Sequence, residues 1–152
     1  MRREAGFTLI EIVCVLAIVA MLAALALPAI PRGTSTARLN AYALEVAAML
    51  SADRYAAIRR RQPVATVMDA QKRTIASGSR GDVIRLPKDV AFDAVVAKQC
   101  AGRAAGSTID FFPSGMSCGG AIGISREGAG FQVRVNWLTG GAEVVAVTPE
   151  KR

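Results

Sequence analysis

The chain has 152 residues, and its 19 basic and 12 acidic side chains give a net charge of +7. It contains no histidine, which excludes histidine bases, histidine metal ligands and most catalytic triads. If the first 28 residues, which are discussed next, are set aside, the remaining length allows one small soluble core and not two.

The first predicted element is an apolar helix that begins almost at the N-terminus. Residues 7–28 contain one charged side chain, Glu11, and run without another charge to Leu27. About 20 apolar residues in a helix match a hydrocarbon core of about 30 Å, so we expect a transmembrane helix over residues 7–28. An ionisable side chain inside a membrane span is costly, which makes Glu11 a candidate functional residue.

Two arginines ahead of this span predict its orientation. Arg2 and Arg3 are expected to stay on the cytoplasmic side, so the domain that follows Pro28 should lie outside. The alternative is a secretory signal peptide with a cleavage site at residues 24–26. The apolar run is longer than the usual h-region of about 7–15 residues, and it contains Glu11, so we favour the membrane span.

A second, amphipathic helix is predicted over residues 37–61 and ends at Gln62-Pro63. The segment from Pro28 to Thr36 either kinks the first helix or ends it. We therefore expect residues 29–62 to continue the helix beyond the membrane. Its apolar side comprises Leu39, Tyr42, Val46, Met49, Leu50 and Ile58, and its polar side comprises Arg38, Glu45, Asp53, Arg54 and Arg59.

Residues 63–152 predict an antiparallel β domain, because short β-prone segments alternate with turn residues. The segments are 64–68, 72–76, 82–86, 108–112, 121–125, 131–137 and 144–148. The first two should form a hairpin, the last two a hairpin about Thr139-Gly140-Gly141, and 108–112 and 121–125 should flank a glycine-rich turn. In residues 131–137 the apolar positions, which end at Trp137, alternate with polar ones, so one face should be buried. A helix followed by antiparallel strands is an α+β domain.

The glycine-rich loop at residues 113–120 contains a match to the hydrolase pattern G-x-S-x-G, centred on Ser117. A serine nucleophile needs a base, and the chain has no histidine to supply one. The tripeptide at residues 80–82 reads Arg-Gly-Asp, and three such residues in a turn occur easily by chance. We therefore expect no catalytic residue.

The three cysteines have different expected roles. Cys14 lies in the predicted span, where it acts as a small apolar residue. Cys100 and Cys118 lie in the exported domain, where an oxidising compartment would join close thiols. We therefore expect a Cys100–Cys118 disulfide if the two residues are close, and sequence alone does not give their distance. Two cysteines without histidine make a poor metal site, so we expect neither a metal nor a cofactor.

The stretch Gly6-Phe7-Thr8-Leu9-Ile10-Glu11 resembles the leader junction of type IV prepilins and type II secretion pseudopilins. The resemblance implies that residues 1–6 are a leader peptide, that a prepilin peptidase cuts between Gly6 and Phe7, and that the same enzyme N-methylates Phe7. It also implies that Glu11 neutralises the α-amine of a neighbouring subunit in a filament. The alternative is that Glu11 lies solvated at the level of the lipid headgroups.

A second resemblance lies in the C-terminal third of the chain. Residues 111–120 and 135–140 resemble the H-type minor pseudopilins of type II secretion (general secretion pathway protein H), whose domain is shared with minor type IV pilins of the FimT kind. Family members often have aspartate where Ser114 and Asn136 stand here. The motif positions are Phe112, Pro113, Gly115, Gly119, Gly120, Trp137 and Gly140.

These resemblances imply a pilin-like fold, with a long N-terminal helix packed on antiparallel sheets, and a non-enzymatic role. The expected protein passes once through the bacterial inner membrane, has its C-terminal domain in the periplasm, and assembles with the other minor pseudopilins and the major one. The pseudopilus serves the export of folded proteins across the outer membrane.

The alternative is a minor type IV pilin that binds DNA for uptake. Without residues 1–6 the chain keeps 17 basic and 11 acidic side chains, and a net charge of +6 suits an acidic partner or an ordinary solvated surface. DNA-binding minor pilins should carry a basic Gly-Arg tail, whereas residues 140–143 read Gly-Gly-Ala-Glu. We therefore do not expect nucleic acid to be the partner.

Overall fold

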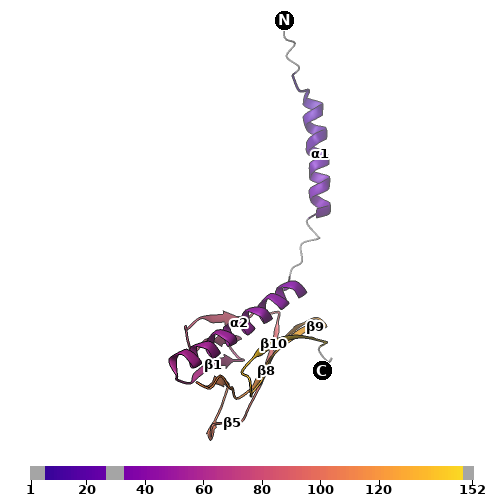
Figure 1. The fold of residues 1–152 in the computed structure, drawn as a ribbon. Coiled ribbons are helices and arrows are strands. Elements are labelled where there is room, and N and C mark those ends of the chain that lie inside the picture. Colours follow the sequence, from indigo (N-terminus) through magenta and orange to yellow (C-terminus); the bar gives the residue numbers. More distant parts are fainter. Residues whose placement is uncertain (1–5, 27–32, 149–152) are drawn as a thin grey trace. The chain divides into compact units, whose positions relative to one another are not determined.

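The protein is described from a computed structural model, in which residues 6–26 and 33–148 are placed (Figure 1). Most of the predicted leader, with Arg2 and Arg3, lies outside the described residues, as does Pro28. The chain divides into two compact units, residues 1–33 and residues 34–152. Each unit is described separately.

The described part of the first unit contains one helix, α1 (Leu9–Ala26), whose only charged residue is Glu11. The second unit starts with helix α2 (Thr36–Arg60), which confirms the helix predicted for residues 37–61 to within one residue. Ser35 caps α2: its backbone is extended (φ −71°, ψ 160°), and its hydroxyl accepts the N–H of Arg38 at 3.3 Å. The extended backbone at Ser35 means that α2 begins as a separate helix at Thr36.

Two four-stranded antiparallel sheets follow α2. Sheet A has the order β3-β2-β1-β7 and sheet B the order β10-β9-β8-β4, while β5 and β6 form a small separate hairpin (Figure 1). The strands of sheet A are β1 (Val64–Asp69), β2 (Thr74–Ala76), β3 (Val83–Arg85) and β7 (Thr108–Phe111). Those of sheet B are β4 (Ala91–Val96), β8 (Gly120–Arg126), β9 (Ala129–Val135) and β10 (Ala142–Val147). The small hairpin joins β5 (Gln99–Cys100) to β6 (Arg103–Ala104).

The core lies between α2 and both sheets. The buried stripe of α2 recurs every three or four residues and contains Leu39, Ala43, Val46, Met49, Leu50, Asp53, Ala56 and Ala57. It packs with Ile75, Ile109 and Phe111 of sheet A and with Ile122, Ile124 and Val133 of sheet B. Because α2 covers strands of both sheets, the predicted α+β class and pilin-like architecture are confirmed.

Both predicted hairpins are confirmed, as β1–β2 and β9–β10. The predicted segments 108–112 and 121–125 do flank the glycine-rich turn, as β7 and β8, but these two strands do not pair with each other. β7 pairs with β1 in sheet A, whereas β8 pairs with β4 and β9 in sheet B. The loop between β7 and β8 therefore carries the chain from one sheet to the other, which adjacency in sequence does not reveal.

Candidate functional site

The predicted processing site lies on an exposed, non-helical segment. The side chain of Phe7 is 80% exposed, and a Cβ at Gly6 would meet no other atom within 4 Å. Residues 6–8 precede α1 and have no regular secondary structure. This geometry leaves the Gly6–Phe7 bond accessible to a peptidase, and cleavage and N-methylation there stay predictions.

Glu11 lies in the first turn of α1, where Thr8 caps the helix. The N–H of Glu11 donates to the Thr8 hydroxyl at 3.3 Å and to the Thr8 carbonyl at 3.1 Å. Thr8 followed by Glu11 has the spacing of a capping box, a signal that the sequence analysis did not use. The carboxylate is therefore set near the positive end of the helix dipole, one turn from Phe7.

Every side chain described from Phe7 to Ala24 is exposed within the single chain. Among the residues that the structure describes, no helix has both the length and the apolar character that a membrane crossing needs. The span predicted for residues 7–28 extends beyond the described residues and stays a prediction. The large exposed apolar side chains are Phe7, Leu9, Ile10, Ile12, Val13, Val15, Leu16, Ile18, Val19, Met21 and Leu22. An apolar surface of this extent is a surface that associates with lipid or protein.

The residues of the second resemblance come together in two segments, the motif loop (residues 112–120) and the motif turn (residues 136–141). They are joined where the N–H of Ser117 donates to the carbonyl of Trp137 at 2.9 Å. Within the turn, the Asn136 side chain accepts the N–H of Leu138 at 2.9 Å and of Thr139 at 3.0 Å. Asparagine thus supplies the acceptor that an aspartate would supply at this family position.

Two glycines allow these segments to pack against α2. Arg54 of α2 donates from Nε to the carbonyl of Gly115 at 2.9 Å. Gly115 and Gly140 have φ values of 84° and 63°, which favour glycine. A Cβ on Gly140 would collide with the Gly115 carbonyl oxygen, and one on Gly115 would lie 3.2 Å from the Arg54 guanidinium. Glycine at these two motif positions therefore allows the backbone at 140 to approach the Gly115 carbonyl and the backbone at 115 to approach the Arg54 side chain.

The prediction that Trp137 ends a half-buried strand is wrong. β9 ends at Val135, because the chain turns at Asn136, and the Trp137 side chain is 61% exposed. The Trp137 Cβ nevertheless accounts for the glycine at position 119, because a Cβ on residue 119 would lie 3.2 Å from it. Leu138 is exposed in the same turn, so the motif turn presents two large apolar side chains to solvent.

The structure joins Cys100 and Cys118 in a disulfide, with Cα atoms 5.7 Å apart. The bond ties β5 to the motif loop, where the N–H of Cys118 also donates to the carbonyl of Asp110 at 3.0 Å. Ligand atoms of Cys100, Asp110 and Cys118 lie within 4.8 Å of one another, but both sulfurs are used by the disulfide. This cluster therefore does not form a metal site while the disulfide is intact. Cys14 is an exposed free thiol in α1.

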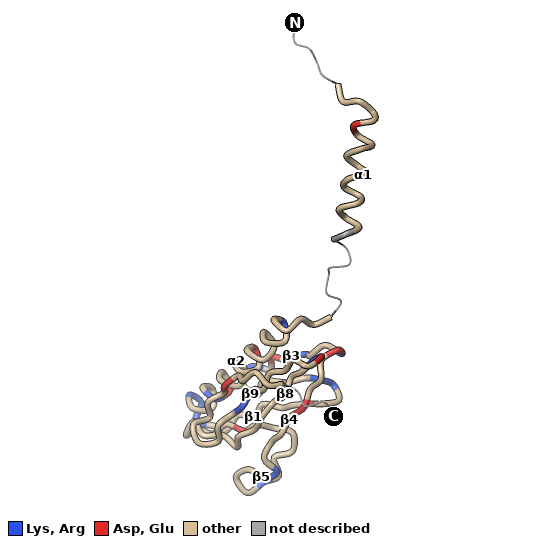
Figure 2. Tube along the Cα trace, turned by 90° about the vertical axis from the view of Figure 1, so that its right-hand side faces the viewer, with Lys and Arg blue, Asp and Glu red and all other residues tan. Residues whose placement is uncertain are grey.

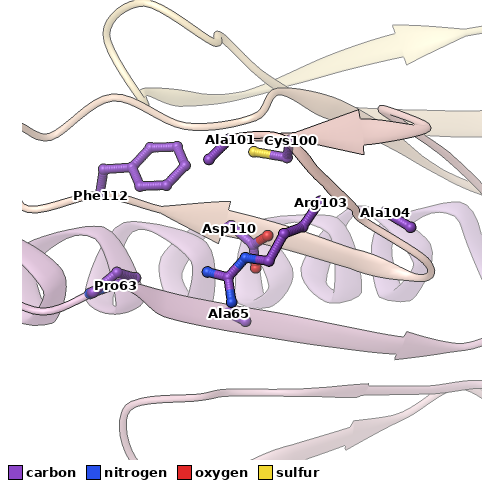
Figure 3. Close-up of a pocket in the computed structure, with 8 residues that line it drawn as sticks. All are labelled: Pro63, Ala65, Cys100, Ala101, Arg103, Ala104, Asp110 and Phe112. Carbon is purple, nitrogen blue, oxygen red and sulfur yellow. The ribbon is translucent and has the colours of Figure 1, made fainter.

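A pocket of about 310 Å³ is lined in part by Cys100 (Figure 3). The Arg103 side chain extends across it toward Asp110 and Ala65 (Figure 3). The lining residues are Pro63, Ala65, Cys100, Ala101, Arg103, Ala104, Asp110 and Phe112. Among these lining residues there is no serine, no threonine and no free thiol.

Two motif matches lose their functional reading on geometric grounds. Ser117 is buried, and its hydroxyl oxygen accepts the N–H of Gly119 at 3.1 Å. In the tripeptide at residues 80–82, Arg80 pairs with Asp82 at 3.1 Å. The serine therefore stabilises the motif loop, and the two charged side chains of the tripeptide form an ion pair with each other.

Asp53 was predicted on the polar side of α2, but it lies fully buried. Its carboxylate accepts the hydroxyls of Thr66 and Ser77, each at 2.6 Å. The N–H groups of Gly78 and Ser79 add bonds at 3.2 Å and 3.1 Å. Burial alone would raise the pKa of Asp53, but the hydrogen bonds outweigh burial and hold the pKa below its ordinary value. Asp53 lies three residues after Leu50 and four before Ala57, so helical spacing alone places it on the buried face of α2, a signal that the sequence interpretation missed.

In the described residues, an apolar N-terminal helix follows the predicted processing junction, and a second unit packs helix α2 against two four-stranded antiparallel sheets; this arrangement defines a pilin-like protein. The family model "Prokaryotic N-terminal methylation motif" matches residues 1–27. A structure of the minor pseudopilin EpsH from the Vibrio cholerae type 2 secretion system matches with a TM-score of 0.55 and 13% identity. That match covers 71% of this chain and 96% of EpsH. A crystal structure of the same pseudopilin gives a TM-score of 0.51 and 13% identity, over 72% of this chain and 93% of that one. These matches establish the fold.

The type II secretion system protein H of Xanthomonas campestris pv. campestris is 32% identical over 141 residues. The alignment covers 91% of this chain and 82% of that protein. The chain belongs to the type II secretion system protein H family, the H-type minor pseudopilins. The alternative of a DNA-binding minor type IV pilin is not favoured by these matches.

Proposed function

We propose that this protein is a non-enzymatic structural subunit of a type II secretion pseudopilus, needed for the export of folded proteins across the outer membrane. Family membership supports the class of function. The observation that carries the proposal is α1: an uncovered apolar helix with one carboxylate in its first turn, directly after an exposed Gly6–Phe7 bond. Such a helix is suited to a filament core.

Processing precedes assembly in this proposal. A prepilin peptidase cuts between Gly6 and Phe7 and N-methylates Phe7, in keeping with the match to a methylation motif over residues 1–27. The chain passes once through the bacterial inner membrane with the β domain in the periplasm. The arginines at positions 2 and 3 support this orientation, since basic residues beside a span stay in the cytoplasm.

Assembly then takes place through Glu11. Cleavage gives Phe7 a cationic α-amine, and the Glu11 carboxylate of one subunit neutralises the amine of a neighbour in the apolar filament core. A desolvated ion pair adds little net stability but penalises misaligned neighbours, which would leave a charge unpaired. The partners are the other minor pseudopilins and the major one.

Substitution of Glu11 tests the proposal. Glu11→Leu removes the charge, Glu11→Gln keeps the shape, and Ile12→Leu is a matched apolar control in the same helix turn. We expect all three to be inserted and cleaved, as read by intact mass. The two Glu11 variants should lose crosslinking to other pseudopilins and export of a secreted protein, while the Ile12 variant should retain both. Wild-type crosslinking of Glu11→Leu would show that assembly does not use the carboxylate.

A further inference from the structure

Thr34, the first residue of the folded unit, is held by two side chains from the β domain. Its N–H donates to Asp89 Oδ2 at 2.8 Å, and its hydroxyl donates to Asp89 Oδ1 at 3.1 Å. Its carbonyl accepts from Arg126 Nη1 at 2.7 Å. All three polar groups of Thr34 thus have partners 55 or 92 residues away in the chain. We call Thr34, Asp89 and Arg126 the anchor.

The two side chains that hold Thr34 are themselves fixed to both sheets. Arg126 is the last residue of β8 and pairs with Asp89, with Nε 3.3 Å from Oδ2. Asp89 lies in the turn between β3 and β4. Arg73, from the β1–β2 turn, donates Nη1 to the carbonyls of Pro87 and Lys88 in that turn. The anchor therefore connects the start of the unit to sheets A and B together.

The anchor is not needed to cap α2. Ser35 already caps the helix through the N–H of Arg38. Thr34 precedes the cap, it is only 8% exposed, and its bonds lead away from the helix. The pKa of Asp89 is held below its ordinary value chiefly by the Thr34 N–H, which agrees with a charged carboxylate at this position. What the anchor fixes is the point at which the chain enters the domain.

We propose that Asp89 and Arg126 are positioning residues for assembly, because they hold Thr34, the first residue of the domain, at one fixed point on the sheets. The proposal rests on the proposed function, in which α1 is packed in a filament. A force that the chain transmits between α1 and the domain then acts on the sheets through Thr34. Without the anchor, the same force would act on the first turn of α2. That turn would open readily, because helix ends are the parts of a helix that open most easily.

Hydrogen exchange of the full-length protein in detergent tests the local part of the proposal. The anchor variants are Asp89→Ala and Arg126→Ala. The matched control is Asp69→Ala, which also removes an acceptor of a backbone N–H (2.8 Å) and an ion pair (3.2 Å), but both are made with Lys72 within one turn. We expect exchange in residues 34–39 to be at least tenfold faster in the anchor variants, and unchanged in residues 46–57 and in the control. Unchanged exchange in residues 34–39, or equal acceleration throughout α2, would overturn the proposal.

Crosslinking to other pseudopilins in cells tests the functional part. The anchor variants should be processed and present at wild-type level, yet crosslink at least severalfold less, whereas Thr34→Ser, which keeps all three polar groups, should behave as wild type. Normal crosslinking of Asp89→Ala would overturn the positioning role. If Glu11→Leu loses crosslinking and Asp89→Ala does not, this proposal alone fails; if deletion of the whole protein leaves export intact, the proposed function fails.

Discussion

Asp53 shows how one side chain joins a helix to a sheet. The carboxylate lies on the buried face of α2 and accepts bonds from Thr66 in β1 and from the loop after β2. Its charge is stabilised by donors alone, because no described basic side chain pairs with it. Hydrogen bonds to a charged acceptor are stronger than neutral ones, so this residue should matter for stability.

We expect Asp53→Asn to lower the free energy of unfolding by about 1–3 kcal/mol. Each carboxylate oxygen accepts one hydroxyl and one backbone N–H, from Gly78 or Ser79. An asparagine side chain has one oxygen and one NH2 group, so its NH2 group would take the place of one carboxylate oxygen. A backbone N–H, from Gly78 or Ser79, would then face a donor and lose its acceptor. Chemical unfolding of the full-length protein in detergent measures the change, and a wild-type value would contradict it.

The pKa of Asp53 also predicts a dependence on pH. Because its folded pKa lies below the unfolded value, Asp53 contributes stability above about pH 4, and this contribution is lost as the pH falls below that value. The difference in unfolding free energy between wild type and Asp53→Asn should therefore shrink toward pH 2–3. A difference that stays constant from pH 7 to pH 3 would show that the native carboxylate is not preferentially charged.

Gly140 gives a second prediction for a single residue. Gly140→Ala should be more destabilising than Gly128→Ala by about 1–3 kcal/mol. Both positions have a positive φ, but a Cβ at 128 would meet no atom within 4 Å, whereas one at 140 would collide with the Gly115 carbonyl. Equal unfolding free energies of the two variants would show that the motif loop does not pack as described.

At the scale of elements, local patterns predicted most of the fold. The β-prone segment 64–68, the alternation in residues 131–137 and the turns beside them predicted the β1–β2 and β9–β10 hairpins. The two-residue strands β5 and β6 are too short to leave a pattern, and β4 alternates poorly because its central residues are Asp93 and Ala94. The crossing from sheet A to sheet B is set by tertiary packing, so the sequence predicted strands on both sides of the glycine-rich turn but not their placement in different sheets.

The candidate site was predictable to a similar extent. The motif glycines could be picked out by resemblance, but their contacts with Arg54 and with each other depend on α2 and two distant loops. The same holds for the anchor, whose three residues are up to 92 positions apart and show no sequence pattern. The Thr8–Glu11 capping signal was local and could have been used.

The disulfide links two of these elements and gives a prediction at this scale. It closes a loop of 18 residues between β5 and the motif loop. Loss of such a crosslink costs about 3 kcal/mol in the chain-entropy account. Cys118→Ser, or reduction of the wild type, should lower the free energy of unfolding by about that amount. Cys14→Ser, in the other unit, should leave it unchanged, and a stability of Cys118→Ser equal to wild type would contradict the linkage.

At the scale of the whole molecule, charge separates the two units. The described part of the first unit carries Glu11 alone, whereas basic and acidic residues are interspersed over the second (Figure 2). A mixed surface of this kind keeps a domain soluble and does not by itself indicate a nucleic-acid partner. In the proposed function, the apolar helix takes part in assembly and the charged, folded domain lies outside the filament core.

We expect the mature protein to be a processed pilin-like subunit that keeps its apolar helix. Intact mass with N-terminal sequencing of the protein extracted from membranes decides this. The chain should begin at N-methylated Phe7 and retain residues 7–28. A chain that begins after Ala26 would show instead that the protein is an ordinary secreted protein and not a filament subunit.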